Sequence, residues 1–461
     1  MELEKILDTP LMTSKFAKIF IRGEDIQLMH SILMDPVYLD SESLQFFESF
    51  KQGKKIRGIL EKAPESRNFI QELINHRLLV KKGVNEIDKI RTFVEKSNSE
   101  DLTIMYLLPT DQCNLRCKYC FLENSMTETY KHSFMNQDTM KKGIDFFAQK
   151  PLKQEGRKVL ILYGGEPLLN SLIVKEAVIY SKDNYPQIGI NLVTNGTLIT
   201  KELAKLFSER DVFVGVSLDG PREITDKIRV YPNGKGVFNS AIKGYEKLKQ
   251  AQCKHLGFSL TIASHNVNNL REHVEYLVRQ FEPNAFGFNF LVDTHFGSNP
   301  YSVPIELATE KAIEAFKYLR EKGIFEERMM RKIKPFIKGT IHLKDCGAIG
   351  NQMVLSPDGD VGPCQAFLPS RKYFNQNITK GEINLEEKSS FGQFKDRYPM
   401  NMKECLDCEA IGICGGGCPY QSYLKTGSIW GLDQRMCIHN KKFLNWLLWD
   451  LYDSKNGNTT S

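Results

Sequence analysis

The sequence of 461 residues has no long uninterrupted apolar run. No stretch approaches the roughly 18 consecutive apolar residues that a membrane-spanning helix requires. The N-terminus, MELEKILDTP, has acidic residues where a secretory signal would have basic residues followed by apolar ones. We therefore expect a cytoplasmic protein that has no membrane partner.

The sequence also lacks a dense block of lysine and arginine. It contains 62 Lys and Arg residues against 56 Asp and Glu residues, which gives a formal net charge of +6. These charges are spread along the whole chain, whereas a nucleic-acid-binding surface usually appears as a basic cluster or stripe. We therefore expect no nucleic-acid partner.

Cysteine, by contrast, is frequent and clustered. A chain of this length can bury a large core without covalent cross-links, so a disulfide scaffold is not needed. Cysteines at short intervals are typical of thiolate ligands to a soft metal, because several sulfurs must converge on one site. Cys253 stands apart from the other ten, which form two arrays: Cys113, Cys117 and Cys120, and then Cys346, Cys364, Cys405, Cys408, Cys414, Cys418 and Cys437.

The first part of the chain predicts a small helical module. Residues 17–22 resemble a strand, and three helical stretches at 43–53, 56–63 and 68–79 lead into a short strand and a Gly turn at 78–83. This order predicts a compact winged-helix-like domain over residues 1–83. Residues 84–101 are strongly charged and predict a linker with some helical character.

Residues 102–325 predict an α/β unit, because short apolar runs alternate with amphipathic helical stretches such as 171–184 and 238–251. Six such repeats indicate a parallel sheet with covering helices, a partial (β/α)6 barrel. The active site of such a barrel lies at the carboxyl ends of its strands. The first cysteine array, YGGEP, TNGT and SLDGP all follow directly after predicted strands, which lie within 102–109, 158–165, 188–196, 212–220, 255–264 and 285–292.

The last part of the chain has little continuous periodicity. Residues 326–440 are rich in Gly, Pro, Asn and Cys, as expected where bound metal clusters organise the chain. A final helix is predicted at 440–452, within a terminal segment of residues 441–461. Its apolar stripe of Trp446, Leu447 and Trp449 is expected to serve packing, and residues 455–461 are expected to be disordered.

The first array has the spacing Cys-x-x-x-Cys-x-x-Cys, so three thiolates would leave one iron of a four-iron cluster without a protein ligand. Zinc fingers, in contrast, close their coordination with four ligands. With YGGEP after the second strand, and SLDGP followed by Asp226, Arg229 and a Gly-rich GKG, the sequence resembles the radical SAM enzymes.

This resemblance implies that S-adenosylmethionine (SAM) binds the open iron and is cleaved to a 5′-deoxyadenosyl radical, which abstracts a hydrogen atom from a substrate. It also implies roles for individual residues. Glu166 and the glycines before it would contact the SAM amino group, Ser217 the ribose, and Arg229 the carboxylate. The local alternatives are a Gly-Gly turn, a strand-end serine and an Arg229–Asp226 pair. The expected SAM contacts are Tyr119, Gly164, Gly165, Glu166, Ser217 and Arg229.

The second array resembles the SPASM extension found on radical SAM enzymes that modify peptides and proteins. By the family pattern, Cys405, Cys408, Cys414 and Cys437 ligate one auxiliary cluster, and Cys346, Cys364 and Cys418 ligate a second. The resemblance thus implies three 4Fe-4S clusters, but two closed auxiliary clusters need eight thiolates and this region supplies seven. Three explanations compete for the missing ligand: Cys253, a non-thiolate ligand such as His342 or Asp345, or an open iron that binds a substrate thiolate.

These features predict a radical SAM peptide maturase that installs an intramolecular cross-link, most simply a Cys thioether, in a ribosomally made precursor. The N-terminal domain would bind the leader of the precursor as an added strand, and a flavodoxin or ferredoxin would donate electrons. One alternative is a carbon–carbon cross-link. Another is a sulfatase-type maturase that forms formylglycine, although Gln365 stands where that family usually has a catalytic Asp. A third alternative, from a different class of protein, is a non-enzymatic metal scaffold, which as a zinc protein would contain only a few zinc ions.

Overall fold

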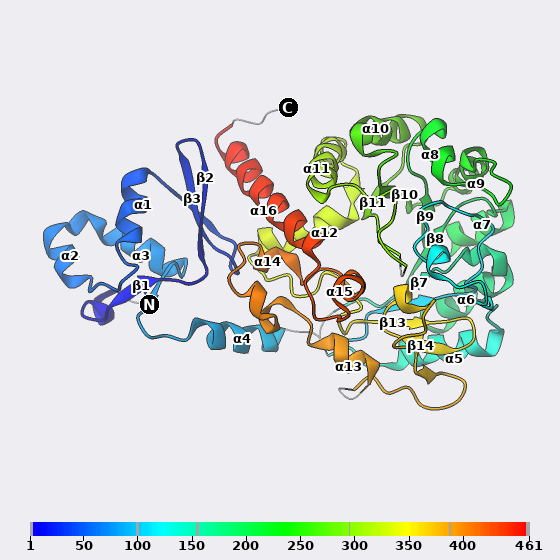
Figure 1. Ribbon diagram of the computed structural model, residues 1–461, viewed down its shortest axis with the longest axis horizontal. Coiled ribbons are helices and arrows are strands. Elements are labelled where there is room, and N and C mark those ends of the chain that lie inside the picture. The colour runs from blue at the N-terminus through cyan, green and yellow to red at the C-terminus, as the bar shows by residue number, and fades with distance from the viewer. Residues whose placement is uncertain (1–2, 98–100, 154–155, 295, 387–388, 458–461) are drawn as a thin grey trace.

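The computed structural model describes residues 3–97, 101–153, 156–294, 296–386 and 389–457. The molecule is elongated: a small N-terminal module lies at one end and an α/β barrel at the other (Figure 1). The last part of the chain, drawn in dark orange and red, lies between the two. No helix among the described residues is both long enough and apolar enough to cross a bilayer.

The N-terminal module contains two small antiparallel sheets and three helices around an apolar core of its own. The predicted strand at residues 17–22 and the three predicted helices are confirmed, whereas β1, β3 and β4 were not expected. Sheet order is β2-β3-β4 in one sheet and β1-β5 in the other. The elements are β1 (Leu11–Thr13), β2 (Ala17–Arg22), β3 (Asp25–His30), β4 (Pro36–Leu39), α1 (Ser41–Glu48), α2 (Arg57–Lys62), α3 (Arg67–Asn75) and β5 (Leu79–Lys81).

Helix α4 (Glu86–Ser97) leads from this module toward the barrel, which confirms the helical character expected there. Residues 98–100 of the expected linker lie outside the described residues. The N-terminal part of α4 is anchored to the module, because Glu86 accepts hydrogen bonds from the Ser14 hydroxyl at 2.5 Å and the Lys15 backbone N–H at 2.9 Å.

The barrel sheet confirms the predicted parallel α/β fold. Each of the six predicted strands forms within its expected stretch, and a short seventh strand, β12, follows them in the same direction. Adjacent strands pair in sequence order, as βαβ units require. The parallel strands are β6 (Ile104–Leu107), β7 (Val159–Leu162), β8 (Gly189–Thr194), β9 (Val212–Ser217), β10 (Leu256–Ile262), β11 (Ala285–Phe290) and β12 (Phe325–Glu326).

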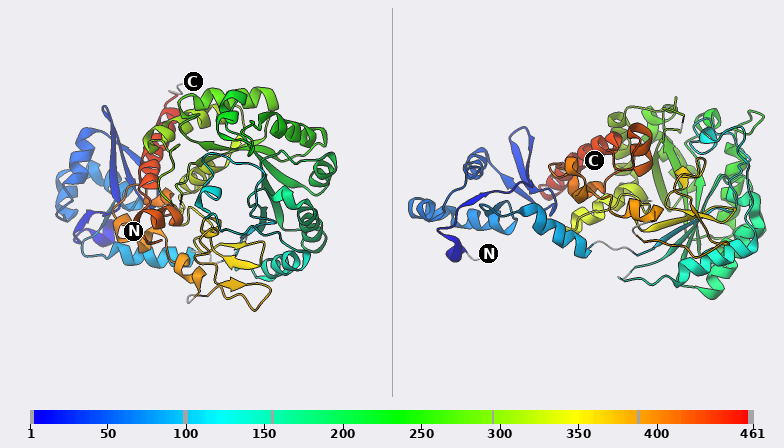
Figure 2. Two further views of the ribbon diagram at one scale, coloured as in Figure 1. Left: turned by 45° about the vertical axis from the view of Figure 1, so that its right-hand side comes forward. Right: turned by 60° about the horizontal axis from the view of Figure 1, so that its bottom comes forward.

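Helices cover the outer face of this curved sheet, while the inner face surrounds the barrel axis (Figure 2). The strands are almost entirely apolar, as expected for strands that are buried on both faces. Polar side chains begin several helices: Asn136 accepts from the Thr139 N–H, and Thr200 from the Leu203 N–H. The barrel helices include α5 (Gln137–Gln149), α6 (Ser171–Asn184), α7 (Lys201–Glu209), α8 (Arg222–Ile228), α9 (Phe238–Gln250), α10 (Leu270–Phe281) and α11 (Ile305–Glu321).

The chain after the barrel extends the same sheet, which was not expected. Strand β13 (Gln352–Leu355) pairs in parallel with β6, the first barrel strand, and two antiparallel strands follow it. This pairing places the cysteine-rich segment beside the barrel. The remaining elements are α12 (Glu327–Lys338), β14 (Asp360–Gly362), β15 (Gln376–Asn377), α13 (Ser390–Lys395), α14 (Ile411–Cys414), α15 (Pro419–Thr426) and α16 (Gln434–Lys455).

Helix α16 begins earlier than predicted, at Gln434 rather than residue 440, so it also contains Cys437. Its apolar stripe serves packing, as expected: Leu447 and Trp449 are buried, and Trp446 is partly buried against the barrel core. The Arg22 guanidinium lies 4.5 Å from the Trp449 ring centroid. Helix α16 therefore joins the barrel to the N-terminal module. It continues to Lys455, so the expected disordered tail is wrong at that residue, and residues 458–461 of that tail lie outside the described residues.

Candidate functional site

The carboxyl ends of β6 and β7 bring the first cysteine array and the YGGEP segment together. The Gly165 N–H donates to the Thr110 carbonyl at 3.2 Å, and the Glu166 N–H donates to the Gln112 carbonyl at 2.8 Å. Gln112 directly precedes Cys113. The loop that begins the cysteine array is therefore held by main-chain hydrogen bonds to the turn after β7.

This contact requires glycine at position 165. A Cβ atom built there would lie 2.2 Å from the Gln112 carbonyl oxygen and 2.6 Å from the Asp111 carbonyl oxygen. Both distances are far shorter than any real carbon–oxygen contact, and both neighbours are backbone. The Gly-Gly pair thus does more than form a turn, since it permits close approach to the cysteine loop.

We expect Gly165→Ala to displace the cysteine loop and to lower iron content, with a loss of stability of about 1–3 kcal/mol. Gly287→Ala in β11 is the matched control, because a Cβ there would meet nothing within 4 Å. Iron analysis and thermal unfolding of both variants measure the effect. A Gly165→Ala protein with wild-type iron content would contradict this interpretation.

The three thiols of the first array are held by backbone geometry rather than by ion pairs. The Leu115 N–H points to the Cys113 sulfur at 3.4 Å, and the Glu123 N–H points to the Cys120 sulfur at 3.5 Å. Burial raises the pKa of Cys117 to about 12 and raises the pKa of the other two thiols. Buried thiols that must ionise require a cation, and a bound metal deprotonates them outright.

Glu166 is a buried carboxyl group that is surrounded by donors. It accepts hydrogen bonds from the Leu168 N–H at 3.0 Å, the Thr194 hydroxyl at 2.7 Å and the Asn195 N–H at 2.7 Å. These hydrogen bonds lower the pKa of Glu166, but burial outweighs them and raises it to about 7. The TNGT segment after β8 therefore supports the carboxyl group of YGGEP, and the two motifs form one site.

Arg229 does not pair with Asp226, so that local alternative is wrong. Its Nε and Nη2 atoms donate to the two carboxylate oxygens of Asp219 at 3.0 and 3.1 Å, whereas Asp226 accepts from the Phe238 N–H. Helix α8 ends before Arg229, whose side chain turns into the barrel toward SLDGP. Ser217 is the last residue of β9 and is half-buried there.

Asp219 is a candidate site residue that the sequence interpretation did not single out. Its fully buried carboxylate also accepts from the Tyr119 hydroxyl at 2.6 Å and the Thr261 N–H at 3.1 Å. Burial favours its neutral form, but Arg229 and His265 hold its pKa below the ordinary range. Asp219 thus joins the cysteine loop to the end of β10, and Tyr119 belongs to this network. Its position in SLDGP, directly after a strand, was the available signal.

The thiols of the second array lie in two sets. The inner set is Cys346, Cys364 and Cys418: burial, together with the other two thiols, raises the pKa of Cys364. The outer set is Cys405, Cys408, Cys414 and Cys437: burial raises the pKa of Cys405 to about 12, and Cys437 and Cys408 contribute. Burial also raises the pKa of Cys414 to about 12, and Cys437 acts in the same direction.

The inner set lies against the carboxyl ends of the barrel strands. Its three cysteines belong to one apolar cluster with Leu108 after β6, Tyr163 after β7 and Val292 after β11. Phe121, which follows Cys120 of the first array, belongs to the same cluster. The inner set therefore faces the same end of the barrel as the first array.

The outer set lies against the N-terminal module. Cys405 and Cys408 pack against an apolar cluster that includes Phe16 and Ile32 of that module. Asp407, between these two cysteines, pairs with Lys18 at 2.7 Å. In α14, which ends at Cys414, the Gly412 N–H donates to the Ser31 carbonyl at 3.1 Å.

The positions of Cys253 and Asp345 bear on which residue could be the eighth ligand of the two auxiliary clusters. The Cys253 thiol lies in the outer helical layer, where it donates to the Ala204 carbonyl of α7 at 3.5 Å. Asp345 is paired with Lys332 at 2.7 Å and lies 3.7 Å from the His342 imidazole. Cys253 is therefore remote from the barrel end, and Asp345 already has a cationic partner.

The donor chemistry fits iron–sulfur clusters. None of the eleven cysteines is in a disulfide. Within the described ranges, no three His, Cys, Asp or Glu side chains converge as ligands of one metal ion would. A four-iron cluster binds each thiolate through a different iron, so its ligands are spaced more widely than those of a single ion.

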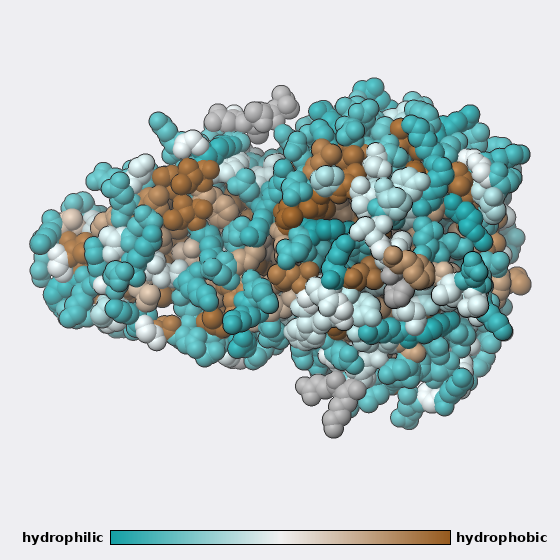
Figure 3. Space-filling model, viewed as in Figure 1, coloured by the Kyte–Doolittle hydropathy of each residue, from teal (hydrophilic) through white to brown (hydrophobic). Residues whose placement is uncertain are grey.

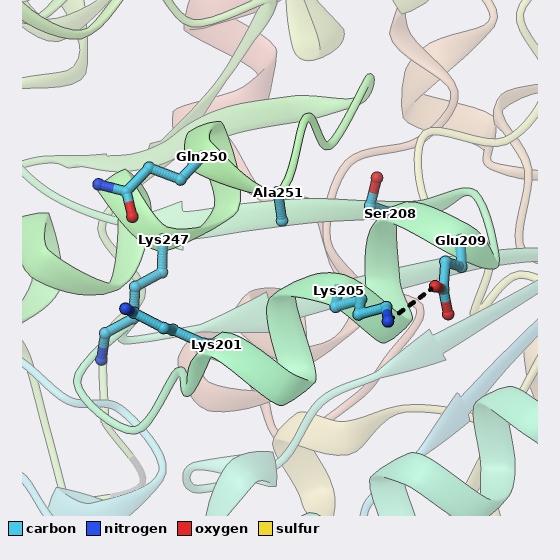
Figure 4. A pocket seen from close by; sticks show the side chains of 7 residues that line it. All are labelled: Lys201, Lys205, Ser208, Glu209, Lys247, Gln250 and Ala251. Atoms are coloured by element: carbon cyan, nitrogen blue, oxygen red, sulfur yellow. Dashed lines mark ion pairs between the residues drawn. The ribbon is translucent and has the colours of Figure 1, made fainter.

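A surface cleft of about 410 Å³ lies away from these residues, between α7 and α9 (Figure 4). Lys201, Lys205 and Lys247 line it together with Glu209, which lies 3.7 Å from the Lys205 ammonium. These side chains are on the outer helices of the barrel. The cleft is therefore separate from the cysteine sites.

Comparison with known proteins shows that the chain is similar to radical SAM proteins. The model of the radical SAM superfamily matches residues 107–277. The radical SAM cyclopropyl synthase TigE of Paramaledivibacter caminithermalis is 22% identical over 458 residues, which cover 93% of each protein. The cysteine-type anaerobic sulfatase-maturating enzyme of Clostridium perfringens strain 13 is 26% identical over 69% of this chain and 88% of its own length.

Solved structures share the fold. Native anSMEcpe with bound AdoMet aligns with a TM-score of 0.64 at 22% identity, covering 77% of this chain and 99% of that one. Streptococcus suis SuiB bound to its precursor peptide SuiA aligns with a TM-score of 0.56 at 16% identity, covering 93% of this chain and 99% of that one. At these identities the likeness establishes the fold of the present chain.

Proposed function

We propose that this chain, whose residues 107–277 match the radical SAM superfamily, is a radical SAM enzyme that installs a thioether between a Cys sulfur and a carbon of a ribosomally made precursor peptide. The observation that carries this proposal is the inner set, which has three thiols and faces the barrel end. A cluster held by three thiolates leaves one iron for an external ligand. A substrate thiolate bound there would lie deprotonated beside the carbon radical.

The residues of the first site have roles that follow from their positions. Cys113, Cys117 and Cys120 would hold the cluster that reduces SAM, and that cluster supplies the radical chemistry. Gly165 allows the turn after β7 to approach the cysteine loop, and the Glu166 carboxylate suits the SAM ammonium group. Ser217, at the end of β9, would contact the ribose.

Arg229 and Tyr119 take part in this site through Asp219. Because two of the Arg229 nitrogens donate to Asp219, the guanidinium is fixed in direction before any ligand binds. Its remaining N–H groups are the ones available for the SAM carboxylate. The Tyr119 ring lies 5.4 Å from the guanidinium carbon of Arg229. Because Tyr119 belongs to the cysteine loop, its contact with Arg229 also orients that loop.

We expect SAM affinity to rise with pH through about 7 and then level off, because only ionised Glu166 pairs with an ammonium group and its pKa is about 7. This pKa is raised above the ordinary value of 4.5, so the neutral form persists through mildly acidic solution. Equilibrium SAM binding across this range measures the effect. Glu166→Gln should bind weakly at every pH, and a wild-type profile without any slope would contradict the assignment.

The N-terminal module is the proposed site for the leader of the precursor. Among the described residues, β2 and β4 are the edge strands of sheet β2-β3-β4, and β2 exposes Ile19 and Ile21, by 38% and 61%. Figure 3 shows an apolar patch on this part of the module. An extended peptide that joins a sheet edge gains main-chain hydrogen bonds and packs alternate side chains against the sheet. Because this binding involves the leader, the sequence of the modified segment can vary.

Point substitutions test this role better than deletion of residues 1–83, because the module packs against α14 and α16. Ile21→Lys should weaken precursor binding about tenfold, or about 1.4 kcal/mol, while SAM cleavage without peptide is unchanged. Ile337→Lys is the matched control, since that isoleucine on α12 is 74% exposed. Equal affinities for both variants would count against the leader site.

A carbon–carbon bond is the second candidate, since TigE, a cyclopropyl synthase, aligns along nearly the whole chain. Formylglycine formation has less support. Gln365 stands after Cys364, and its amide oxygen lies 3.4 Å from the Gln352 amide nitrogen. An amide cannot act as the general base that a carboxylate supplies.

The deciding experiment is the mass of a candidate Cys-containing precursor peptide after anaerobic co-expression with the enzyme. Loss of two hydrogens per modified Cys, with that thiol no longer alkylated, would support the thioether. The same loss with every thiol free would support carbon–carbon bond formation. An unchanged mass despite SAM cleavage would overturn the assignment of this precursor as substrate.

A further inference from the structure

Arg397, in the loop after α13, is a charged side chain buried between the two auxiliary cysteine sets. It is fully inaccessible to solvent. Its Nη1 atom donates to the Gly416 carbonyl at 2.7 Å, and Nη2 donates to the Ser422 hydroxyl at 2.8 Å. It also donates to three further carbonyl oxygens, those of Gly417, Ile429 and Gly431.

Every acceptor of Arg397 among the described residues is neutral. The nearby carboxylate of Asp433 is directed elsewhere, since it accepts from the Cys418 N–H at 3.4 Å and the Met436 N–H at 3.5 Å and lies 3.5 Å from Arg435. A buried cation without a counter-charge is strongly unfavourable. Neutral carbonyl groups satisfy the hydrogen bonds of the guanidinium but not its charge.

Besides Asp433, which does not hydrogen-bond to Arg397, the thiols of both sets are a source of negative charge near the guanidinium. Burial lowers the pKa of Arg397, while Cys418 of the inner set, the Asp433 carboxylate, and Cys414 and Cys405 of the outer set act in the opposite direction. A cluster core of roughly +2 carries a charge of about −2 with four thiolates, as in the outer set, and of about −1 with three, as in the inner set. Bound clusters would therefore supply the counter-charge that the buried guanidinium needs.

The hydrogen bonds of Arg397 also fix the link between the sets. Gly415, Gly416 and Gly417 join Cys414 of the outer set to Cys418 of the inner set, and all three have positive φ, from 67° to 86°. The guanidinium binds the carbonyl groups of the last two. The planar fork of arginine can bind several carbonyls at once, which the single ammonium of lysine cannot do.

We propose that Arg397 is a positioning residue whose charge sets the reduction potential of the auxiliary clusters. Its positive charge favours the more negative, reduced state of either neighbouring cluster, so the clusters accept an electron more readily. Arg397 touches no substrate and acts through the two cysteine sets. This inference rests on the cluster ligation that accompanies the proposed function.

Arg397→Gln and Arg397→Lys test the proposal together. The first removes the charge, while the second keeps it and loses the fork. Arg320→Gln is the matched control, because that arginine pairs with Asp450 on α16, far along the helix from Cys437. Each reconstituted protein is analysed for iron and titrated with reductant under electron paramagnetic resonance, which separates the clusters without any assay of activity.

At the potential that reduces half of the wild-type auxiliary clusters, we expect Arg397→Gln to show about a tenfold smaller reduced fraction. Arg397→Lys should titrate close to wild type, and the cluster of the first array should be unchanged in both. Wild-type potentials in Arg397→Gln would overturn the proposal. If Arg397→Gln retains no auxiliary iron, equal loss in Arg397→Lys would overturn it, and retention there would support it. A wild-type protein with only four irons would instead overturn the cluster ligation itself.

Discussion

Cys117→Ala is expected to abolish SAM cleavage and to remove one four-iron cluster per protein. Cys117 lies in the middle of the first array, on a loop held by hydrogen bonds from the Arg116 and Lys118 N–H groups to the carbonyls of Val230 and Ile228. Two remaining thiolates cannot hold a cluster that also leaves an iron open for SAM. Anaerobic assay of 5′-deoxyadenosine, together with iron analysis, measures both losses.

Cys253→Ala is the matched control for that substitution. It removes a thiol of similar burial whose hydrogen bond runs to α7 in the outer helical layer. This variant should retain all of its iron and its SAM cleavage. If both substitutions abolished cleavage, loss of folding rather than of a cluster ligand would be responsible, and the assignment of the first array would fail.

The barrel and its site could be predicted because their signals are local. Four of the six predicted strands are short apolar runs followed at once by a polar motif, so each motif supports the assignment of the strand before it. The pairing of β13 with β6 could not be predicted in this way. Its four residues carry no periodic pattern, and the partner strand lies more than 240 residues earlier in the chain.

The contacts of charged residues were harder to predict than the motifs that contain them. Asp226 is three residues from Arg229, so proximity in sequence favoured that pair, but the fully buried Asp219 has the greater need of a cation. Arg397 stands in a polar segment that resembles an exposed loop. Its burial depends on the Gly-rich link and residues 429–431, which come together only in the folded domain.

The inner and outer sets should respond differently to a Cys-containing precursor. Cys346→Ala is expected to abolish the cross-link while SAM cleavage persists, because the inner set lies at the barrel end and the first array is intact. Adding the precursor should alter the auxiliary-cluster spectrum of the wild-type enzyme, since a substrate thiolate would become a ligand of iron. The same addition should leave the spectrum of Cys346→Ala unchanged.

Cys408→Ala in the outer set is the comparison that makes this test specific. It also removes a thiolate ligand, but from the set that packs against the N-terminal module. The precursor should therefore still perturb the inner cluster of Cys408→Ala. A perturbation that survives Cys346→Ala and disappears in Cys408→Ala would place the substrate thiol at the outer set. A wild-type spectrum that the precursor does not change would count against iron–thiolate binding, and would favour the carbon–carbon reaction, in which no substrate sulfur is required.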